Sequence, residues 1–241
     1  MIKDESQVSD QVSKQIDLDE LSYIISHDLQ EPLRMVTSYM QLLNKRYGDK
    51  LDENAREYIG FAVDGSNRLK QMMDDLLTYS RIGRPGLNIE KVDPESIILQ
   101  AKKLVKDKYK RNNFSINANF GNVREIKGDK SLLITLFFNI IDNSLKFNQS
   151  PEQAIEIELN EDSEDWIFSV RDNGFGIEKE YHSKVFGVFQ KLHNHSEFPG
   201  SGIGLAICEK IARRHNGKIW IDADTKEGTK IFISIQKENN R

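Results

Sequence analysis

Apolar side chains in the N-terminal third of the chain recur at alternating intervals of three and four residues. In the first stretch, from about Val8 to Leu43, they are Leu18, Ile25, Leu29, Pro32, Val36, Tyr39 and Leu43. After a polar turn at residues 47–50, a second series includes Leu51, Ala55, Ile59, Ala62, Leu69, Met73, Leu76 and Leu77 and ends at about Arg81. This spacing is typical of helices that pack along one stripe. We therefore expect two long helices that form an antiparallel hairpin.

A single hairpin of this kind would leave much of its apolar stripe in contact with water. Pairing of two hairpins into a four-helix bundle covers the stripe. We therefore expect a homodimer in which each copy contributes two helices. The upstream positions from Val8 to Leu18 continue the stripe, so they would carry a twist or a change of register into the bundle.

The pattern changes after Ile82-Gly83-Arg84-Pro85-Gly86, where glycine and proline end the second helix. Further helical patterns cover residues 94–111, 130–147 and 204–215. Strand-like runs cover residues 114–119, 123–127, 155–159, 166–170, 218–221 and 230–235. Helices on one face of a mixed sheet form a two-layer α/β sandwich.

The expected fold class is therefore α+β. An N-terminal antiparallel helical hairpin forms a dimeric four-helix bundle, and an α/β two-layer sandwich follows it. The expected boundaries are residues 1–83 for the signalling helix and hairpin, 84–92 for a linker, and 93–241 for the sandwich domain.

Composition narrows the function classes. The net charge of −4 argues against nucleic-acid binding, and the basic run 106–111 is expected to be a solvated helix end. No segment approaches the roughly 20 apolar residues that span a bilayer, and the N-terminus lacks the apolar core of a signal peptide. We expect a soluble, cytoplasmic chain without a membrane segment. The single cysteine, Cys208, lies among apolar residues, and we expect no redox role for it.

His27 is the first candidate for chemistry. Ile25 and Leu29 set the buried direction of the first helix, and at roughly 100° per residue His27 points the opposite way, into solvent. Pro32 removes a backbone hydrogen bond and makes this part of the helix deformable. A neutral imidazole is a nucleophile near neutral pH, and Asp28 is placed to orient it or take up its proton. An incidental surface histidine would look the same from this geometry alone.

The helix expected over residues 130–147 carries a polar row. Asn139 and Asn143 are four residues apart and Lys146 follows three later, so they share one face. Because Mg²⁺ prefers oxygen ligands and keeps several waters, a side-chain amide oxygen could bridge it to phosphate. The alternative, a solvated polar face, is weakened by the large apolar residues around this row.

Two glycine motifs come later in the chain. Asp172-Asn173-Gly174-Phe175-Gly176 ends an expected strand, and Gly200-Ser201-Gly202-Ile203-Gly204 opens onto the helix that begins at Leu205. Glycine lets a backbone approach a ligand closely, and a helix N-terminus can hold phosphate. P-loop and dinucleotide-binding motifs do not fit, because there is no Gly-Lys-Ser/Thr and the glycines follow a loop rather than a first strand. A plain turn is the alternative for the first motif taken alone.

These blocks, in this order, resemble the H, N, G1 and G2 boxes of the sensor histidine kinases across nearly the whole chain. The H box is Ser26-His27-Asp28-Leu29-Gln30-Glu31-Pro32-Leu33 and the N box is Asn139-Ile140-Ile141-Asp142-Asn143. Residues 185–192 resemble the F box, which belongs to a mobile lid. The string from His27 to Arg34 is most similar to kinases attached to phytochrome-type or PAS-type sensors.

The resemblance implies roles for individual residues. His27 would be the phosphate acceptor with Asp28 as its acid–base partner, and Asn143 would be the magnesium ligand. Asp172 would accept a hydrogen bond from the adenine amino group. The other implied nucleotide-binding residues are Asn139, Lys146, Gly174, Gly176, Lys191, Gly200, Gly202, Gly204 and Leu205. Gly228-Thr229, before the last strand, is expected to close the pocket floor.

Two departures from the family pattern concern Lys191 and Glu31. Lys191 stands where the family often has an arginine. Glu31 stands where one large branch has the Thr or Asn that positions water for dephosphorylating the partner. The resemblance therefore does not extend to phosphatase activity by that route.

The implied reaction uses ATP and Mg²⁺, forms phosphohistidine and ADP, and passes the phosphoryl group to an aspartate of a response-regulator receiver domain. A sensor would either precede residue 1 in a longer protein or be a separate partner. Two rival functions are a gyrase- or chaperone-like ATPase and a degenerate kinase that serves as a dimeric scaffold. The ATPases have an acid where Asn139 stands, and a degenerate kinase would show damaged glycine loops or a lost acceptor.

Overall fold

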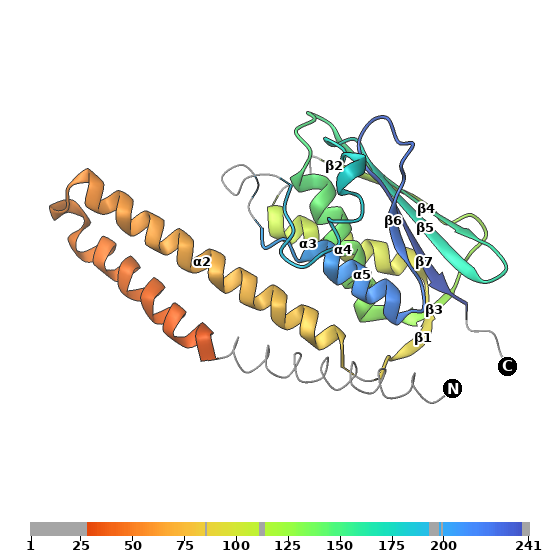
Figure 1. Cartoon of the computed structure of the whole chain (residues 1–241), viewed down its shortest axis with the longest axis horizontal. Coiled ribbons are helices and arrows are strands. Elements are labelled where there is room, and N and C mark those ends of the chain that lie inside the picture. Colours follow the sequence, from red (N-terminus) through yellow and green to blue (C-terminus); the bar gives the residue numbers. More distant parts are fainter. Residues whose placement is uncertain (1–27, 85, 111–113, 193–197, 199, 238–241) are drawn as a thin grey trace. The chain divides into compact units, whose positions relative to one another are not determined.

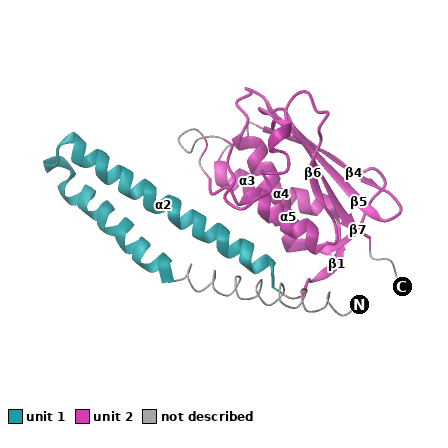
Figure 2. Ribbon diagram, in the orientation of Figure 1, with its two compact units in different colours: residues 1–84 teal, residues 85–241 magenta. Residues whose placement is uncertain are grey.

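The computed structural model describes residues 28–84, 86–110, 114–192, 198 and 200–237, and the predictions for His27 and for the helix before it concern residues outside these ranges. The chain divides into two compact units, residues 1–84 and 85–241 (Figure 2). Each unit is described by itself.

Unit 1 contains the expected helical hairpin. Residues 28–47 are helical without a break at Pro32, a short 3-10 helix η1 covers Gly48–Lys50, and helix α2 covers Glu53–Ile82. Asp52 caps α2 by accepting a hydrogen bond from the backbone N–H of Ala55 at 2.7 Å. Gln30 Nε2 donates to Asp74 Oδ1 at 2.8 Å and joins the two helices.

The two sides of the hairpin differ in burial. Ile59, Met73 and Leu77 of α2 are buried within the unit. Several large apolar residues of the expected stripe are not: Leu29 is 48% exposed, Tyr39 62% and Leu69 46%. Tyr58 and Phe61 of α2 are also mostly exposed. The single chain therefore buries only part of the apolar surface that its sequence pattern provides.

Unit 2 is built on a five-stranded sheet in the order β2-β4-β5-β7-β6. The strands are β2 (Phe114–Asn119), β4 (Gln153–Glu161), β5 (Asp165–Asp172), β6 (Ile219–Ile221) and β7 (Lys230–Gln236). β2 and β4 are parallel, and the other pairs are antiparallel. The sheet is thus mixed, as expected.

Helices α3 (Pro94–Tyr109), α4 (Lys130–Lys146) and α5 (Gly204–Arg214) lie on one face of this sheet (Figure 1). A short 3-10 helix, η2, covers Lys179–Tyr181. Side chains of β4 alternate, with Ile155 and Ile157 buried and Glu156 exposed, so one face of the strand meets the helices. Phe137 of α4 packs edge-on against Phe168 of β5 at 4.9 Å between ring centroids. The helical unit followed by the α/β sandwich confirms the expected fold class.

A second, two-stranded sheet was not expected. Strand β1 (Ile89–Val92) pairs antiparallel with β3 (Ile126–Asp129), so β1 occupies part of the segment predicted to be a linker. Only Val92 of β1 is buried, which is why its apolar pattern is weak. The strand expected at residues 123–127 begins later, because the backbone N–H of Val123 closes a turn onto the carbonyl of Phe120.

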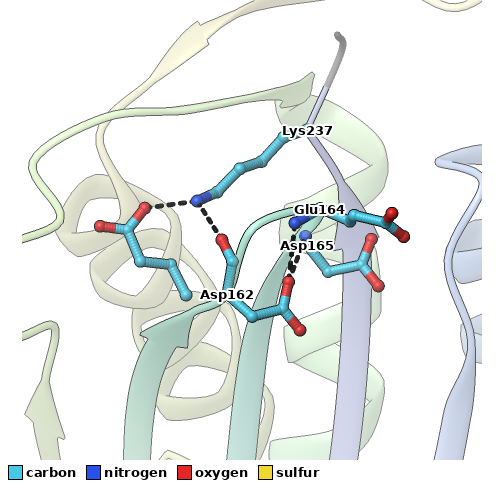
Figure 3. A network of polar contacts seen from close by, with 5 residues as sticks. Asp162, Glu164, Asp165 and Lys237 are labelled. Carbon is cyan, nitrogen blue, oxygen red and sulfur yellow. Dashed lines mark hydrogen bonds and ion pairs between the residues drawn. The ribbon is translucent and has the colours of Figure 1, made fainter.

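The tip of the β4–β5 hairpin is held by a polar network (Figure 3). Asp162 Oδ1 accepts hydrogen bonds from the backbone N–H groups of Glu164 and Asp165. Lys237, just beyond β7, donates to the carbonyl of Asp162 at 2.7 Å and pairs with Glu161 at 2.6 Å. The turn between β4 and β5 is therefore tied to the residue that directly follows β7.

Candidate functional site

Helix α4 presents the polar row that its sequence predicts. Asn139, Asn143 and Lys146 are half-buried, whereas Ile140 and Ile141 between them are fully buried against the sheet side. Asn139 Nδ2 donates to the carbonyl of Thr135 one turn earlier at 2.8 Å. That bond leaves the Asn139 oxygen free to face the start of α5.

The second glycine loop meets this row directly. A Cβ at Gly204 would lie 3.0 Å from Asn139 Oδ1 and 3.8 Å from Asn143 Nδ2, so the first residue of α5 passes over both amides. A Cβ at Gly200 would collide with the ammonium group of Lys146. The structure therefore brings the row of α4 and the loop 200–204 together, and Leu205 follows in the first turn of α5.

Gly202 and Lys191 connect this loop to the preceding segment. Gly202 has φ +80°, and a Cβ there would lie 2.8 Å from the carbonyl oxygen of Gln190. The left-handed conformation and the close approach both require glycine. The Lys191 ammonium donates a hydrogen bond to the carbonyl of Gly200. Two cationic groups, from Lys146 and Lys191, thus lie next to Gly200.

Asp172 ends β5 and is 8% exposed. Its Oδ1 accepts hydrogen bonds from the backbone N–H of Gly174 at 2.9 Å and of Thr229 at 3.1 Å, and its Oδ2 accepts from Ser144 Oγ at 2.9 Å. Burial raises the pKa of this carboxyl above its usual range, and the three hydrogen bonds oppose that rise. Asp172 is therefore a buried, oriented acceptor.

The motif after Asp172 interlocks with the turn between β6 and β7. Gly228 has φ +71°, and a Cβ there would overlap the carbonyl oxygen of Asp172. A Cβ at Gly176, which has φ +78°, would lie 3.0 Å from the Gly228 oxygen. A Cβ at Gly174 would lie 2.6 Å from the carbonyl oxygen of Phe147, at the end of α4. These contacts explain why glycine stands at each position.

The sequence pattern did not predict a role for Ser144, and it predicted Thr229 only as part of the pocket floor. Ser144 is 5% exposed and Thr229 9% exposed, and both orient Asp172. The backbone carbonyl of Thr229 also accepts a hydrogen bond from the Asp172 N–H at 2.9 Å. The available signal for Ser144 was its position directly after Asn143.

Thr229 also lines a cavity of about 150 Å³. Its lining includes Ile177, His182, Ile221, Asp222 and Lys230. Within the described residues, no group of three or more His, Cys, Asp or Glu side chains is arranged to hold a metal ion.

The segment that resembles the H box is described only from Asp28 onward. Asp28 is exposed at the start of the described part of the first helix, and His27 lies just outside the described residues. Among the described residues, none of the helices has the length and apolar character needed to cross a membrane.

Two family models match the chain. The model for the His Kinase A (phospho-acceptor) domain matches residues 17–85. The model for the Histidine kinase-, DNA gyrase B-, and HSP90-like ATPase matches residues 128–239. With a helical acceptor unit followed by an ATPase-type sandwich, the chain belongs to the sensor histidine kinases.

Individual relatives refine this assignment. The chain is 36% identical over 219 residues to the phytochrome-like protein Cph1 of Synechocystis, covering 91% of this chain and 29% of Cph1. It is 35% identical to cyanobacterial phytochrome A of Nostoc, covering 91% of this chain and 28% of that protein. The chain thus spans less than a third of these curated relatives. These matches agree with the phytochrome-like character of the H box.

A solved structure supports the fold over both units. Full-length ShkA in complex with AMPPNP is similar with a TM-score of 0.68 at 21% identity, covering 90% of this chain and 46% of ShkA. At this identity the likeness establishes the fold alone.

Proposed function

We propose that this chain is the kinase core of a two-component sensor. It binds ATP in unit 2, phosphorylates His27 and passes the phosphoryl group to an aspartate of a response-regulator receiver domain. The observation that supports the proposal most strongly is the contact between the polar row of α4 and the glycine loop before α5. Gly204 lies directly beside Asn139 and Asn143 there. Backbone N–H groups at a helix N-terminus and the nearby Lys146 and Lys191 suit a polyphosphate.

The residues present also fit Mg²⁺. A single neutral amide oxygen from Asn143, with Asn139 beside it, suits an ion that retains waters and is shared with nucleotide phosphates. The bound ion would supply neutralisation of phosphate charge during transfer. Asn143 would hold it, and Asn139 and Lys146 would fix the phosphates around it.

Asp172 suits the other end of the nucleotide. Its buried carboxyl is held by three donors, and it would accept a further hydrogen bond from the adenine amino group. Gly174 and Gly176 keep the adjoining backbone close to that position.

In the transfer step, an imidazole nitrogen of His27 forms a bond to the γ-phosphorus while the bond from that phosphorus to the bridging oxygen of ADP breaks. Asp28 orients the imidazole and takes up its proton. The products are ADP and phosphohistidine, a phosphoramidate that can donate its phosphoryl group onward. We further propose that the kinase works in the cytoplasm as a homodimer and answers to a sensor region like those of its phytochrome-type relatives.

Incubation of the purified chain with Mg²⁺ and γ-labelled ATP tests the function, with a His27→Gln variant as the matched control. We expect a covalent label on the unaltered chain that is labile to acid and stable to base, and no label on His27→Gln. Phosphate release without any protein-bound label would favour the ATPase alternative. Absence of both label and release, with ATP still bound, would favour a binding scaffold.

A further inference from the structure

Three side-chain amides join the end of α4 to the loop after Asp172. Asn148 follows α4 by two residues and is 5% exposed. Gln153 begins β4 and is 6% exposed, and Asn173 directly follows Asp172. None of these three belongs to the nucleotide-binding residues considered above.

Asn148 and Asn173 are hydrogen-bonded to each other, with Asn148 Nδ2 donating to Asn173 Oδ1 at 2.7 Å. Backbone groups determine how each amide is oriented. Asn148 Oδ1 accepts from the N–H of Ser150 at 2.8 Å, and Asn173 Oδ1 accepts from the N–H of Ala154 at 2.9 Å. Asn173 Nδ2 donates to the carbonyl of Glu152 at 2.8 Å. Because an N–H only donates and a carbonyl only accepts, neither amide can be reversed without losing bonds.

Gln153 completes the connection from the other side. Its Nε2 donates to the carbonyl of Leu145 at 3.1 Å and to that of Asn148. The last carbonyls of a helix have no partner within the helix, so these bonds satisfy the end of α4. The end of α4 is thereby fixed to the start of β4.

The backbone makes the same junction tighter. Phe175 N–H donates to the carbonyl of Phe147 at 3.1 Å, and Gly174 leaves no room for a side chain against that carbonyl. One side of the junction is α4, which carries Asn139 and Asn143, and the other is the loop that carries Asp172. Together with the hydrogen bond from Ser144 to Asp172, the junction therefore sets the spacing between the proposed phosphate end and the proposed adenine end of the site.

We propose that Asn148 and Asn173 are positioning residues for nucleotide recognition, acting by holding Asp172 at a set distance from the α4 row. This inference rests on the proposed function of the site. At position 173 the amide both accepts from Asn148 and Ala154 and donates to Glu152. An aspartate lacks the donor and a serine is too short, so the role is specific to asparagine.

The decisive variant is Asn148→Ser in the full chain. A serine hydroxyl can still accept from the N–H two residues on, as in an ST-turn, but it does not reach Asn173. Gln149→Ala is the matched control, because Gln149 is the exposed neighbouring amide. Titration calorimetry with Mg²⁺-ADP and Mg²⁺-GDP gives the affinity and the preference for adenine, and thermal unfolding reports the fold.

We expect Asn148→Ser to bind ADP about tenfold more weakly, as for one lost buried hydrogen bond. The ratio of ADP to GDP affinity should fall, because Asp172 is no longer held in register, and Gln149→Ala should leave both unchanged. The Asn148→Ser/Asn173→Ala double variant should bind ADP no more weakly than Asn173→Ala alone, because both changes break the same contact between residues 148 and 173.

An unchanged ADP to GDP ratio in a folded Asn148→Ser chain would show that the junction is only structural, and would overturn the inference while the proposed function stands. If the serine variant does not fold, Asn173→Ala, which removes the same Asn148–Asn173 contact from its other side, supplies the comparison. An unaltered chain that binds neither nucleotide would instead contradict the proposed function, and this inference with it.

Discussion

Asp172 is a buried carboxyl whose surroundings favour its neutral form. Burial raises its pKa, so at neutral pH the ionised group costs stability, and that cost diminishes as the pH falls. The environment nevertheless presents three donors to it. A group that is retained although it is unfavourable for the fold is a candidate for function.

Asp172→Asn should separate stability from binding. The amide oxygen can still accept from Gly174 and Thr229, and the amide nitrogen can donate to the Ser144 hydroxyl, so the free energy of unfolding should be equal or higher. An amide nitrogen is a poor partner for the adenine amino group, and ATP affinity should fall about tenfold to a hundredfold. Calorimetric ATP titration and chemical denaturation measure the two quantities. An unaltered ATP affinity would show that Asp172 does not contact the nucleotide.

His215 is a buried group outside the proposed nucleotide site. Its Nε2 accepts from the backbone N–H of Asp129 at 3.0 Å, and its Nδ1 donates to the carbonyl of Ile211 at 2.8 Å. This pattern requires the neutral ring. Burial lowers the pKa of His215, and the positive charge of Arg214 lowers it further. The hydrogen bond to the Ile211 carbonyl and the negative charge of Asp129 oppose this lowering. Because Asp129 caps α4, the histidine supports the helix that carries the polar row.

The stability of unit 2 should depend on this ring in acid. Since the folded pKa lies below the ordinary value of 6.5, the stabilisation is present above that pH and is lost as the pH falls below it. The slope for one proton is at most about 1.4 kcal/mol per pH unit. Denaturation curves at several pH values should show this loss in the unaltered chain and less of it in His215→Gln. Identical pH profiles would contradict the prediction.

At the scale of elements, the site depends on how closely loops pass each other. Gly228 in the β6–β7 turn and the end of β5 approach so closely that only a hydrogen atom fits on the Gly228 Cα. Thr229 then forms two hydrogen bonds with Asp172. The last hairpin of the sheet therefore helps to place the proposed adenine acceptor.

Gly228→Ala should destabilise unit 2 by more than backbone strain alone. The positive φ costs about 1–2 kcal/mol, and the overlap with Asp172 adds to it. Gly86→Ala is the control, because Gly86 also has a positive φ but has no atom within 4 Å of its Cβ position. Chemical denaturation should give a clearly larger loss for Gly228→Ala. Equal losses would mean that the strand ends can separate at no cost.

At the scale of the whole molecule, the exposed apolar side chains of unit 1 bear on how the chain assembles. Tyr39, Tyr58, Phe61 and Leu69 are each at least 46% exposed in the single chain. Water contact on so many large side chains is unfavourable, and a second hairpin would cover them. We therefore keep the homodimer as a prediction.

Phe61→Asp should weaken self-association. Each dimer would lose two buried phenylalanine side chains, about 3–6 kcal/mol in total, so the dissociation constant should rise about a hundredfold or more. Sedimentation equilibrium measures this directly. Arg56→Ala, at an exposed position of α2 roughly 140° around the helix from Phe61, is the control and should leave the constant nearly unchanged. A monomeric unaltered chain at micromolar concentration would contradict the dimer.

The local sequence pattern alone determined most of the secondary structure of this protein and the family to which it belongs. The helices of unit 2 and five of its strands are predicted by periodicity, because one buried face imposes a period of 3.6 or 2 on the residues. The ordered motifs around His27, Asn139, Asp172 and Gly200 identify the family, which the domain matches confirm. Strand β1 was missed because only one of its side chains is buried and its partner β3 is distant in the sequence.

Only the tertiary structure decided which residues meet. Ser144 and Thr229 orient Asp172 from two different elements, and Asn148 and Asn173 join α4 to the loop after β5. Glycine is required at position 228 because a side chain there would overlap the backbone of Asp172, which ends β5 more than fifty residues earlier. Such contacts leave no periodic trace, because each depends on one polar group or one missing side chain. The sequence determined the elements and the chemistry they carry, and the packing of those elements determined the geometry of the site.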